Sequence, residues 1–128
     1  MNDNKTEGEW EKELSKEVFE VCRLGGTERP FSGEYNKHYE KGTYQCAACK
    51  NALFSSDTKY DSKSGWPSFF QPISNEALDF LEDKKLGQVR VEVKCRNCKS
   101  HLGHVFEDGP EPTNKRFCIN SLALEFKS

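Results

Sequence analysis

The sequence predicts a mainly β domain with an N-terminal helix and a metal site built from four cysteines. Strand-like runs separated by turn residues occupy the chain from Gly42 onward. Two Cys-x-x-Cys motifs stand among these runs, at residues 46–49 and 95–98. The chain has 128 residues, of which 34% are hydrophobic, so we expect one domain whose small core needs an additional stabilising link.

An amphipathic helix is predicted near the N-terminus. From Glu9 onward, apolar residues recur at every fourth position and share one helix face. They are Trp10, Leu14, Val18 and Cys22. Gly25-Gly26 ends this pattern, which places Cys22 at the C-terminal end of the helix. Residues 1–7 are polar, so we expect a disordered tail before a single domain at 8–128.

The β region is predicted to begin with a hairpin over residues 43–54, whose tip carries the first cysteine pair. A loop that packs through its aromatic rings precedes this hairpin at 31–41, and a polar loop follows it at 55–64. Trp66 comes after the polar loop and directly before Pro67, which favours a fixed and partly exposed indole.

Alternating valines predict a further strand at 89–93 with one buried face. This strand leads to the second cysteine pair, which we place at the tip of a second hairpin. Residues 75–81 fit either a short helix or an irregular strand. The remaining predicted strands cover residues 101–106, 117–119 and 122–126.

The two cysteine motifs have the spacing of paired zinc knuckles. Their four residues are Cys46, Cys49, Cys95 and Cys98. Four thiolates at about 2.3 Å complete a tetrahedral Zn²⁺ shell and leave no position for a substrate, so the predicted role is structural. Two disulfides, four free thiols and an iron–sulfur cluster are the alternatives.

Cys118 stands outside both pairs, with Arg116 and Asn120 two residues away on either side. In a strand these three side chains point to the same face. A thiol beside a cation can ionise near neutral pH, so we interpret Cys118 as a nucleophile. The alternative is a small buried hydrophobic residue, which is a common role of free cysteine.

His101 and His104 lie three residues apart in another strand-like run. One alternative is that both histidines are zinc ligands of a Cys₂His₂ site. The four cysteines already fill the metal shell, however, which leaves the histidines for acid–base chemistry. A thiol of pKa ~8.5 is already about 3% thiolate at pH 7, so full ionisation increases the rate by at most roughly 30-fold. The pattern therefore favours a substrate whose leaving oxygen needs a proton, with either histidine as its donor.

The composition argues against several classes of partner. With 19 basic and 21 acidic residues the formal net charge is −2, which disfavours nucleic acid or an anionic membrane as the main partner. No apolar run approaches the ~20 residues that span a bilayer, and the first residues lack the apolar segment of a signal peptide. We therefore expect a cytoplasmic monomer with reduced cysteines.

Six motifs occur in a characteristic order. They are Gly-Gly-Thr-Glu-Arg-Pro-Phe-Ser-Gly-Glu-Tyr at 25–35, the two Cys-x-x-Cys pairs, Gly-Trp-Pro-Ser-Phe at 65–69, His-Leu-Gly-His-Val-Phe at 101–106, Asp-Gly-Pro at 108–110 and Arg-Phe-Cys-Ile-Asn-Ser at 116–121. In this order the chain, from about residue 8, resembles the zinc-containing B-type peptide methionine sulfoxide reductases, which reduce the R epimer of methionine sulfoxide.

The resemblance implies two small antiparallel sheets that form a barrel-like core, with helices on the N-terminal side. It also implies that the Cys118 thiolate attacks the sulfoxide sulfur and becomes a sulfenic acid, while His104, assisted by Asn120, protonates the oxygen. Trp66 would contact the methyl group on sulfur and select the epimer, unless it only packs in the core. His101, Asp108 and Arg116 would orient this shell, although Asp108 also suits a plain turn.

The sequence departs from the family pattern at Ser64, where many members carry the cysteine that resolves the sulfenic acid. Cys22 is the remaining thiol, and we interpret it as the resolving residue, with thioredoxin reducing the resulting disulfide. The alternatives are a buried helix residue at Cys22 and direct reduction by an external thiol. A non-enzymatic zinc-ribbon module that binds another protein is the rival class of function.

Overall fold

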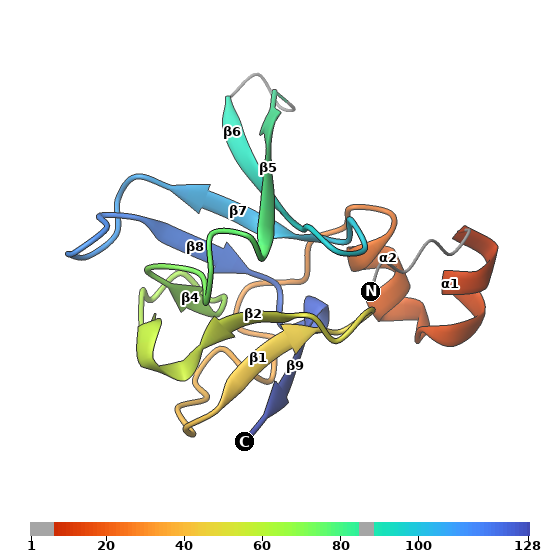
Figure 1. Ribbon diagram of the computed structural model, residues 1–128, viewed down its shortest axis with the longest axis horizontal. Helices are drawn as coiled ribbons and strands as arrows, with labels where there is room; N and C mark the ends of the chain where they lie inside the picture. The colour runs from red at the N-terminus through yellow and green to blue at the C-terminus, as the bar shows by residue number, and fades with distance from the viewer. Residues whose placement is uncertain (1–6, 85–88) are drawn as a thin grey trace.

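The computed structural model describes residues 7–84 and 89–128 and confirms a mainly β fold with two antiparallel sheets (Figure 1). Most of the predicted tail, residues 1–6, lies outside the described residues, and Glu7 is the first residue of a helix. Among the described residues, no helix is long and apolar enough to cross a membrane.

The smaller sheet has the strand order β2-β1-β9. Its strands are β1 (Thr43–Cys46), β2 (Ala52–Ser55) and β9 (Leu124–Lys127). The β1–β2 pair is the predicted first hairpin, with the first cysteine pair at its turn. The C-terminal strand β9 pairs along the other edge of β1, so this sheet joins the middle of the chain to its end.

The larger sheet has the order β3-β4-β8-β7-β6-β5. Its strands are β3 (Lys59–Tyr60), β4 (Ser68–Phe69), β5 (Leu78–Asp83), β6 (Arg90–Cys95), β7 (His101–Phe106) and β8 (Arg116–Ile119). The open assignment at 75–81 is thus resolved mainly as a strand. Val89 precedes β6 and is 68% exposed, so the buried face of this strand begins only at Val93.

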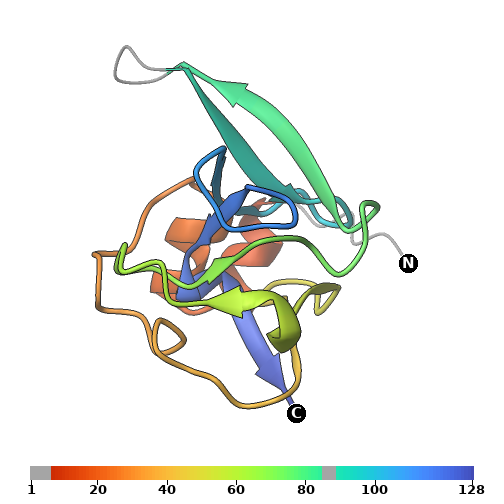
Figure 2. The ribbon, with the colours of Figure 1, turned by 90° about the vertical axis from the view of Figure 1, so that its left-hand side faces the viewer.

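The sheets do not close into the predicted barrel. The reason is that β5 and β6 pair along their whole length and project from the body of the molecule as a hairpin (Figure 2), so β5 is an edge strand. The two sheets are joined by packing instead. Phe54 of the small sheet stacks on Phe69 of the large sheet, with ring centroids 4.3 Å apart, and also contacts Phe117.

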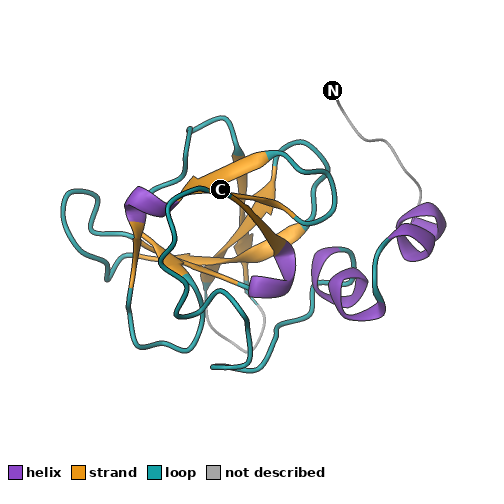
Figure 3. Cartoon of the chain, turned by 90° about the horizontal axis from the view of Figure 1, so that it is seen from below, coloured by secondary structure: helices purple, strands orange, loops and turns teal. Residues whose placement is uncertain are grey.

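The predicted N-terminal helical stretch is present, but it is divided into two short helices, α1 (Glu7–Glu13) and α2 (Lys16–Cys22), on one side of the sheets (Figure 3). Ser15 causes the break. Its backbone is extended, and its hydroxyl accepts a hydrogen bond from the Val18 N–H (3.3 Å), which caps α2. The described residues also contain the short 3₁₀ helices η1 (Ser56–Thr58) and η3 (Ser121–Ala123).

Candidate active site and metal centre

Cys118 lies within β8 and has a paired strand on each side. The antiparallel register sets it opposite Ser68 of β4 and opposite His104 of β7. Because side chains alternate along a strand, Phe117 and Ile119 enter the core while Cys118 points away from it. The pairing therefore holds a half-buried thiol next to a histidine on the neighbouring strand.

The Cys118 thiol faces a cavity of about 330 Å³. The residues predicted from the sequence that line this cavity are Trp66, His104, Arg116, Cys118 and Asn120. Thr27, Ser64, Arg90, Gly103 and Phe106 complete its wall. Five separate segments of the chain thus meet at this cavity.

Trp66 and Asn120 are both held by Glu28. The Trp66 indole Nε1 donates a hydrogen bond to the Glu28 carbonyl (3.0 Å), and the Glu28 backbone N–H donates to Asn120 Oδ1 (3.0 Å). Asn120 is buried, and its Nδ2 donates to the Leu102 carbonyl (3.0 Å). Both polar atoms of the Asn120 amide bind backbone groups, which fixes the orientation of this side chain.

Each histidine has a carboxylate partner. His104 Nε2 lies 2.9 Å from Asp83 Oδ2, and His101 Nδ1 lies 2.6 Å from Glu92 Oε2. The two imidazole rings meet edge to face with centroids 5.6 Å apart. His101 is buried beside His104 and lines a neighbouring cavity of about 240 Å³ rather than the one that Cys118 faces. The carboxylates fix the orientation of both rings.

Sequence reasoning missed these two carboxylates. The signal for Glu92 was present, because it alternates with the valines of a predicted strand that leads into the hairpin with the histidine strand. Asp83 carried no such signal. It lies beyond the stretch 75–81, whose structure was open, and its place beside His104 follows only from the β5–β6–β7 pairing.

Arg116 is fixed between Asp108 and Phe106. Its Nε and Nη2 donate to the two carboxylate oxygens of Asp108 at 2.9 and 3.2 Å, and its guanidinium lies 4.5 Å from the centroid of the Phe106 ring. The guanidinium holds the pKa of Asp108 below its usual range. Asp108 is exposed and does not line the cavity, so it reaches the thiol only through Arg116.

The Cys118 thiol is not ionised by its neighbours alone. Burial raises its pKa, and this outweighs the Ser64 hydroxyl and the Arg116 guanidinium, which lower it. Ser64 Oγ lies 3.9 Å from Cys118 Sγ. Burial of the thiol therefore opposes the ionisation that was predicted from its cationic neighbour.

The structure does not bring Cys22 to Cys118. Cys22 is 2% exposed and ends α2, where its neighbours are Cys98 and Ser100. Burial is the main cause that raises the pKa of Cys22, to about 12. A disulfide between Cys22 and Cys118 would require the end of α2 to leave the core.

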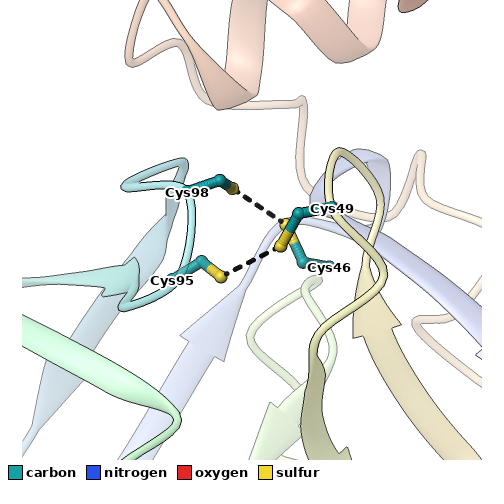
Figure 4. A group of neighbouring side chains, drawn as sticks. All are labelled: Cys46, Cys49, Cys95 and Cys98. Carbon is teal, nitrogen blue, oxygen red and sulfur yellow. Dashed lines mark hydrogen bonds between the residues drawn. The ribbon is translucent and has the colours of Figure 1, made fainter. Parts of the chain in front are cut away.

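The four remaining cysteines form one cluster in which all sulfur atoms lie within 4.8 Å of one another (Figure 4). The distance from Cys46 Sγ to Cys98 Sγ, and that from Cys49 Sγ to Cys95 Sγ, is 3.6 Å. Four sulfurs at ~2.3 Å from one tetrahedral ion would be about 3.8 Å apart, so the donor set fits a single bound metal.

The two turns that carry these cysteines have the same shape. Each motif is followed by a lysine with a left-handed backbone, Lys50 at φ 67° and Lys99 at φ 66°. In both turns this lysine N–H donates to the carbonyl of the first cysteine, at 2.8 Å. One turn belongs to the small sheet and the other to the large sheet, so a metal here would link the two sheets.

Comparison with known proteins agrees with these features. The family model of the SelR domain matches residues 14–128. A protein of Pseudomonas paraeruginosa named "Peptide methionine sulfoxide reductase MsrB" is 57% identical over 116 residues, which are 91% of this chain and 88% of the relative.

Relatives of the same name occur in other organisms. The protein of Methylibium petroleiphilum is 53% identical over 123 residues, with 96% of this chain and 89% of the relative covered. That of the archaeon Methanosarcina barkeri is 56% identical over 124 residues, with 97% and 87% covered. The chain therefore belongs to the SelR domain family, the B-type methionine sulfoxide reductases.

Proposed function

We propose that this protein reduces methionine-R-sulfoxide in oxidised peptides and proteins, with Cys118 as the attacking thiolate. The observation that carries the proposal is the direct opposition of Cys118 and His104 on paired strands, beside a cavity that Trp66 also lines. The names of the relatives support the same activity.

In the proposed reaction, oxygen moves from the substrate sulfur to Cys118. The thiolate attacks the sulfoxide sulfur, and His104 donates a proton to the sulfoxide oxygen. The hydroxyl then passes from the substrate sulfur to the Cys118 sulfur as the substrate S–O bond and the transient S–S bond break. Methionine leaves and Cys118 carries the sulfenic acid, so the substrate sulfur is reduced by two electrons and the cysteine sulfur is oxidised by two. Asn120 borders the oxygen position, and His101 lies behind His104.

Because burial raises the pKa of Cys118, the rate depends both on formation of the thiolate and on proton donation by His104. Substrate binding must first favour the thiolate, and proton donation by a positioned acid contributes about 10²–10⁴-fold to a rate. Asp83 supports this role because its carboxylate lies within hydrogen-bond distance of His104 Nε2 and fixes the orientation of the ring. Arg116, held by Asp108, supplies the positive charge that stabilises the thiolate once it forms.

Trp66 is proposed to contact the methyl group on the substrate sulfur. Its indole is tied to the Glu28 carbonyl and follows a polar loop, so the ring has one orientation at the cavity wall. A fixed aromatic surface on one side of the sulfur, with the proton donor on the other, accepts only one epimer.

Cys22 is proposed to resolve the sulfenic acid by forming a disulfide with Cys118, which thioredoxin then reduces. A disulfide needs Cα atoms within about 7 Å, so the end of α2 must unwind. Gly25, with φ 77°, follows the helix and gives the chain a flexible point. Cytosolic reducing conditions would return Cys22 and Cys118 to the reduced state between turnovers.

The metal of the four-cysteine cluster is proposed to be Zn²⁺ in a structural role. The cluster contains only sulfur donors at tetrahedral spacing, which suits Zn²⁺, and it is a different part of the molecule from the Cys118 cavity. When bound, the ion would hold the two sheets in register and take no part in the reaction.

The assigned activity is tested by turnover of dabsyl-methionine sulfoxide with dithiothreitol. We expect the zinc-loaded protein to reduce the R epimer and leave the S epimer unchanged, and Cys118→Ser to lower the rate at least ~10³-fold because no nucleophile remains. Cys22→Ser is the matched control and should keep turnover, since dithiothreitol reduces the sulfenic acid directly. Wild-type protein without turnover of the R epimer would refute the proposal.

The resolving role is tested by mass spectrometry after one equivalent of substrate without reductant. We expect wild-type protein to contain a Cys22–Cys118 disulfide, because Cys22 is the one cysteine besides Cys118 that lies outside the four-cysteine cluster. Dimedone added with the substrate should then label little Cys118. Wild-type protein that accumulates dimedone-reactive Cys118 and no disulfide would refute the resolving role and favour direct reduction by an external thiol.

The structural role of the metal is tested with Cys46→Ser. We expect this variant to lose bound zinc and to melt at a lower temperature, because metal binding in small zinc domains contributes on the order of 10 kcal/mol. Cys118→Ser should retain one zinc per chain. Zinc binding by the four-cysteine cluster is contradicted if the zinc content, measured by atomic absorption, is the same in Cys46→Ser and wild type.

A further inference from the structure

Glu28 is a buried acid that the proposed reaction does not use. It is 7% exposed and lies in the segment between α2 and β1, next to Thr27, which lines the Cys118 cavity. Glu28 itself does not line that cavity. Its carboxylate Oε1 accepts a hydrogen bond from the Leu122 N–H (2.9 Å) in η3.

The side chain and the backbone of Glu28 bind opposite ends of one short segment. The backbone N–H binds Asn120 Oδ1, and the carboxylate binds the N–H of Leu122 two residues later. The Glu28 carbonyl accepts from the Trp66 indole. A single buried residue thus joins the start of η3 to Trp66. It holds Trp66 and Asn120 at the cavity, and both are proposed to contact the substrate.

The chain around Glu28 is shaped to enclose its carboxylate. A Cβ atom on Gly33 would collide with Glu28 Oε2 and with the Ser121 hydroxyl. The same hydroxyl accepts a hydrogen bond from the Tyr35 N–H (3.2 Å). Burying a carboxyl group is unfavourable unless it is hydrogen-bonded. Oε1 has the Leu122 N–H as donor, whereas Oε2 is buried without a hydrogen-bond partner among the described residues. An apolar residue here would leave the Leu122 N–H without its acceptor.

We propose that Glu28 is a positioning residue for the reaction, whose carboxylate fixes its own backbone so that Trp66 and Asn120 keep their orientation beside Cys118. The inference rests on the proposed function for the meaning of those two residues. Displacement of a substrate-binding group by about 1 Å can cost ~10²-fold in rate, so this anchoring has a measurable effect.

The test compares Glu28→Ala, Glu28→Asp and Glu28→Gln with Glu34→Ala, an exposed acid of the same segment. Gln keeps an acceptor for the Leu122 N–H, whereas Ala lacks one and Asp is one methylene too short to reach it. We expect kcat/KM for methionine-R-sulfoxide to fall about 10–100-fold in the Glu28→Ala and Glu28→Asp variants. The kcat/KM of Glu28→Gln should stay within a few-fold of the wild-type value, and that of Glu34→Ala should equal the wild-type value.

A readout on Trp66 separates positioning from general loss of stability. The Trp66 indole signal in ¹H–¹⁵N spectra is assigned by its loss in Trp66→Phe. The Trp66 Nε1–H should exchange slowly with solvent in wild type and in Glu28→Gln, and faster in Glu28→Ala and Glu28→Asp. Preference for the R over the S epimer should fall in the same variants. If Ala fails to fold, Asp and Gln still decide the result.

Zinc-loaded Asp or Ala protein with unchanged kcat/KM and an unchanged Trp66 signal would overturn the positioning role. So would a Gln variant that is as impaired as Ala, because the acceptor would then not be what matters. Failure of the proposed function is distinguishable, because inactive wild-type protein would still show whether the Trp66 signal depends on Glu28.

Discussion

The register of β8 between β4 and β7 is the constraint on which the site depends. It sets Cys118 opposite His104 and Ser68 and turns Phe117 and Ile119 into the core. A shift by one residue would exchange these faces and bury the thiol. Close approach reinforces the register: a side chain at Gly103 would collide with the Cys118 carbonyl, so only glycine fits there.

Two features compensate for the small core. Phe54 and Phe69 stack across the sheets, and the cysteine cluster brings a turn of one sheet next to a turn of the other, where a bound metal would link them. The site itself is built from loops and strand residues that these links hold still. Glu28 adds the remaining connection, because it ties the N-terminal segment to Trp66 and to the chain that follows Cys118.

Much of this arrangement could be predicted from the sequence because the signals are local. Strand alternation and the Cys-x-x-Cys spacing identify both hairpins and the cluster, and the i±2 rule places Arg116 and Asn120 on the same side as Cys118. What could not be predicted depends on distant pairing. Asp83 reaches His104 only through two strand pairings, and burial raises the pKa of Cys118 against its cationic neighbour. The helix break at Ser15 was a local signal, since serine is a good N-cap, but the apolar periodicity concealed it.

The central claim is that the Cys118 sulfur takes the oxygen from the substrate. The most direct measurement is a single turnover of Cys22→Ser with ¹⁸O-labelled methionine-R-sulfoxide and no reductant, followed by mass spectrometry of the intact protein and of the peptide that contains Cys118. We expect one methionine to be released per protein and one ¹⁸O atom to be bound to Cys118. Methionine released with Cys118 unmodified, or with the label on another residue, would contradict it.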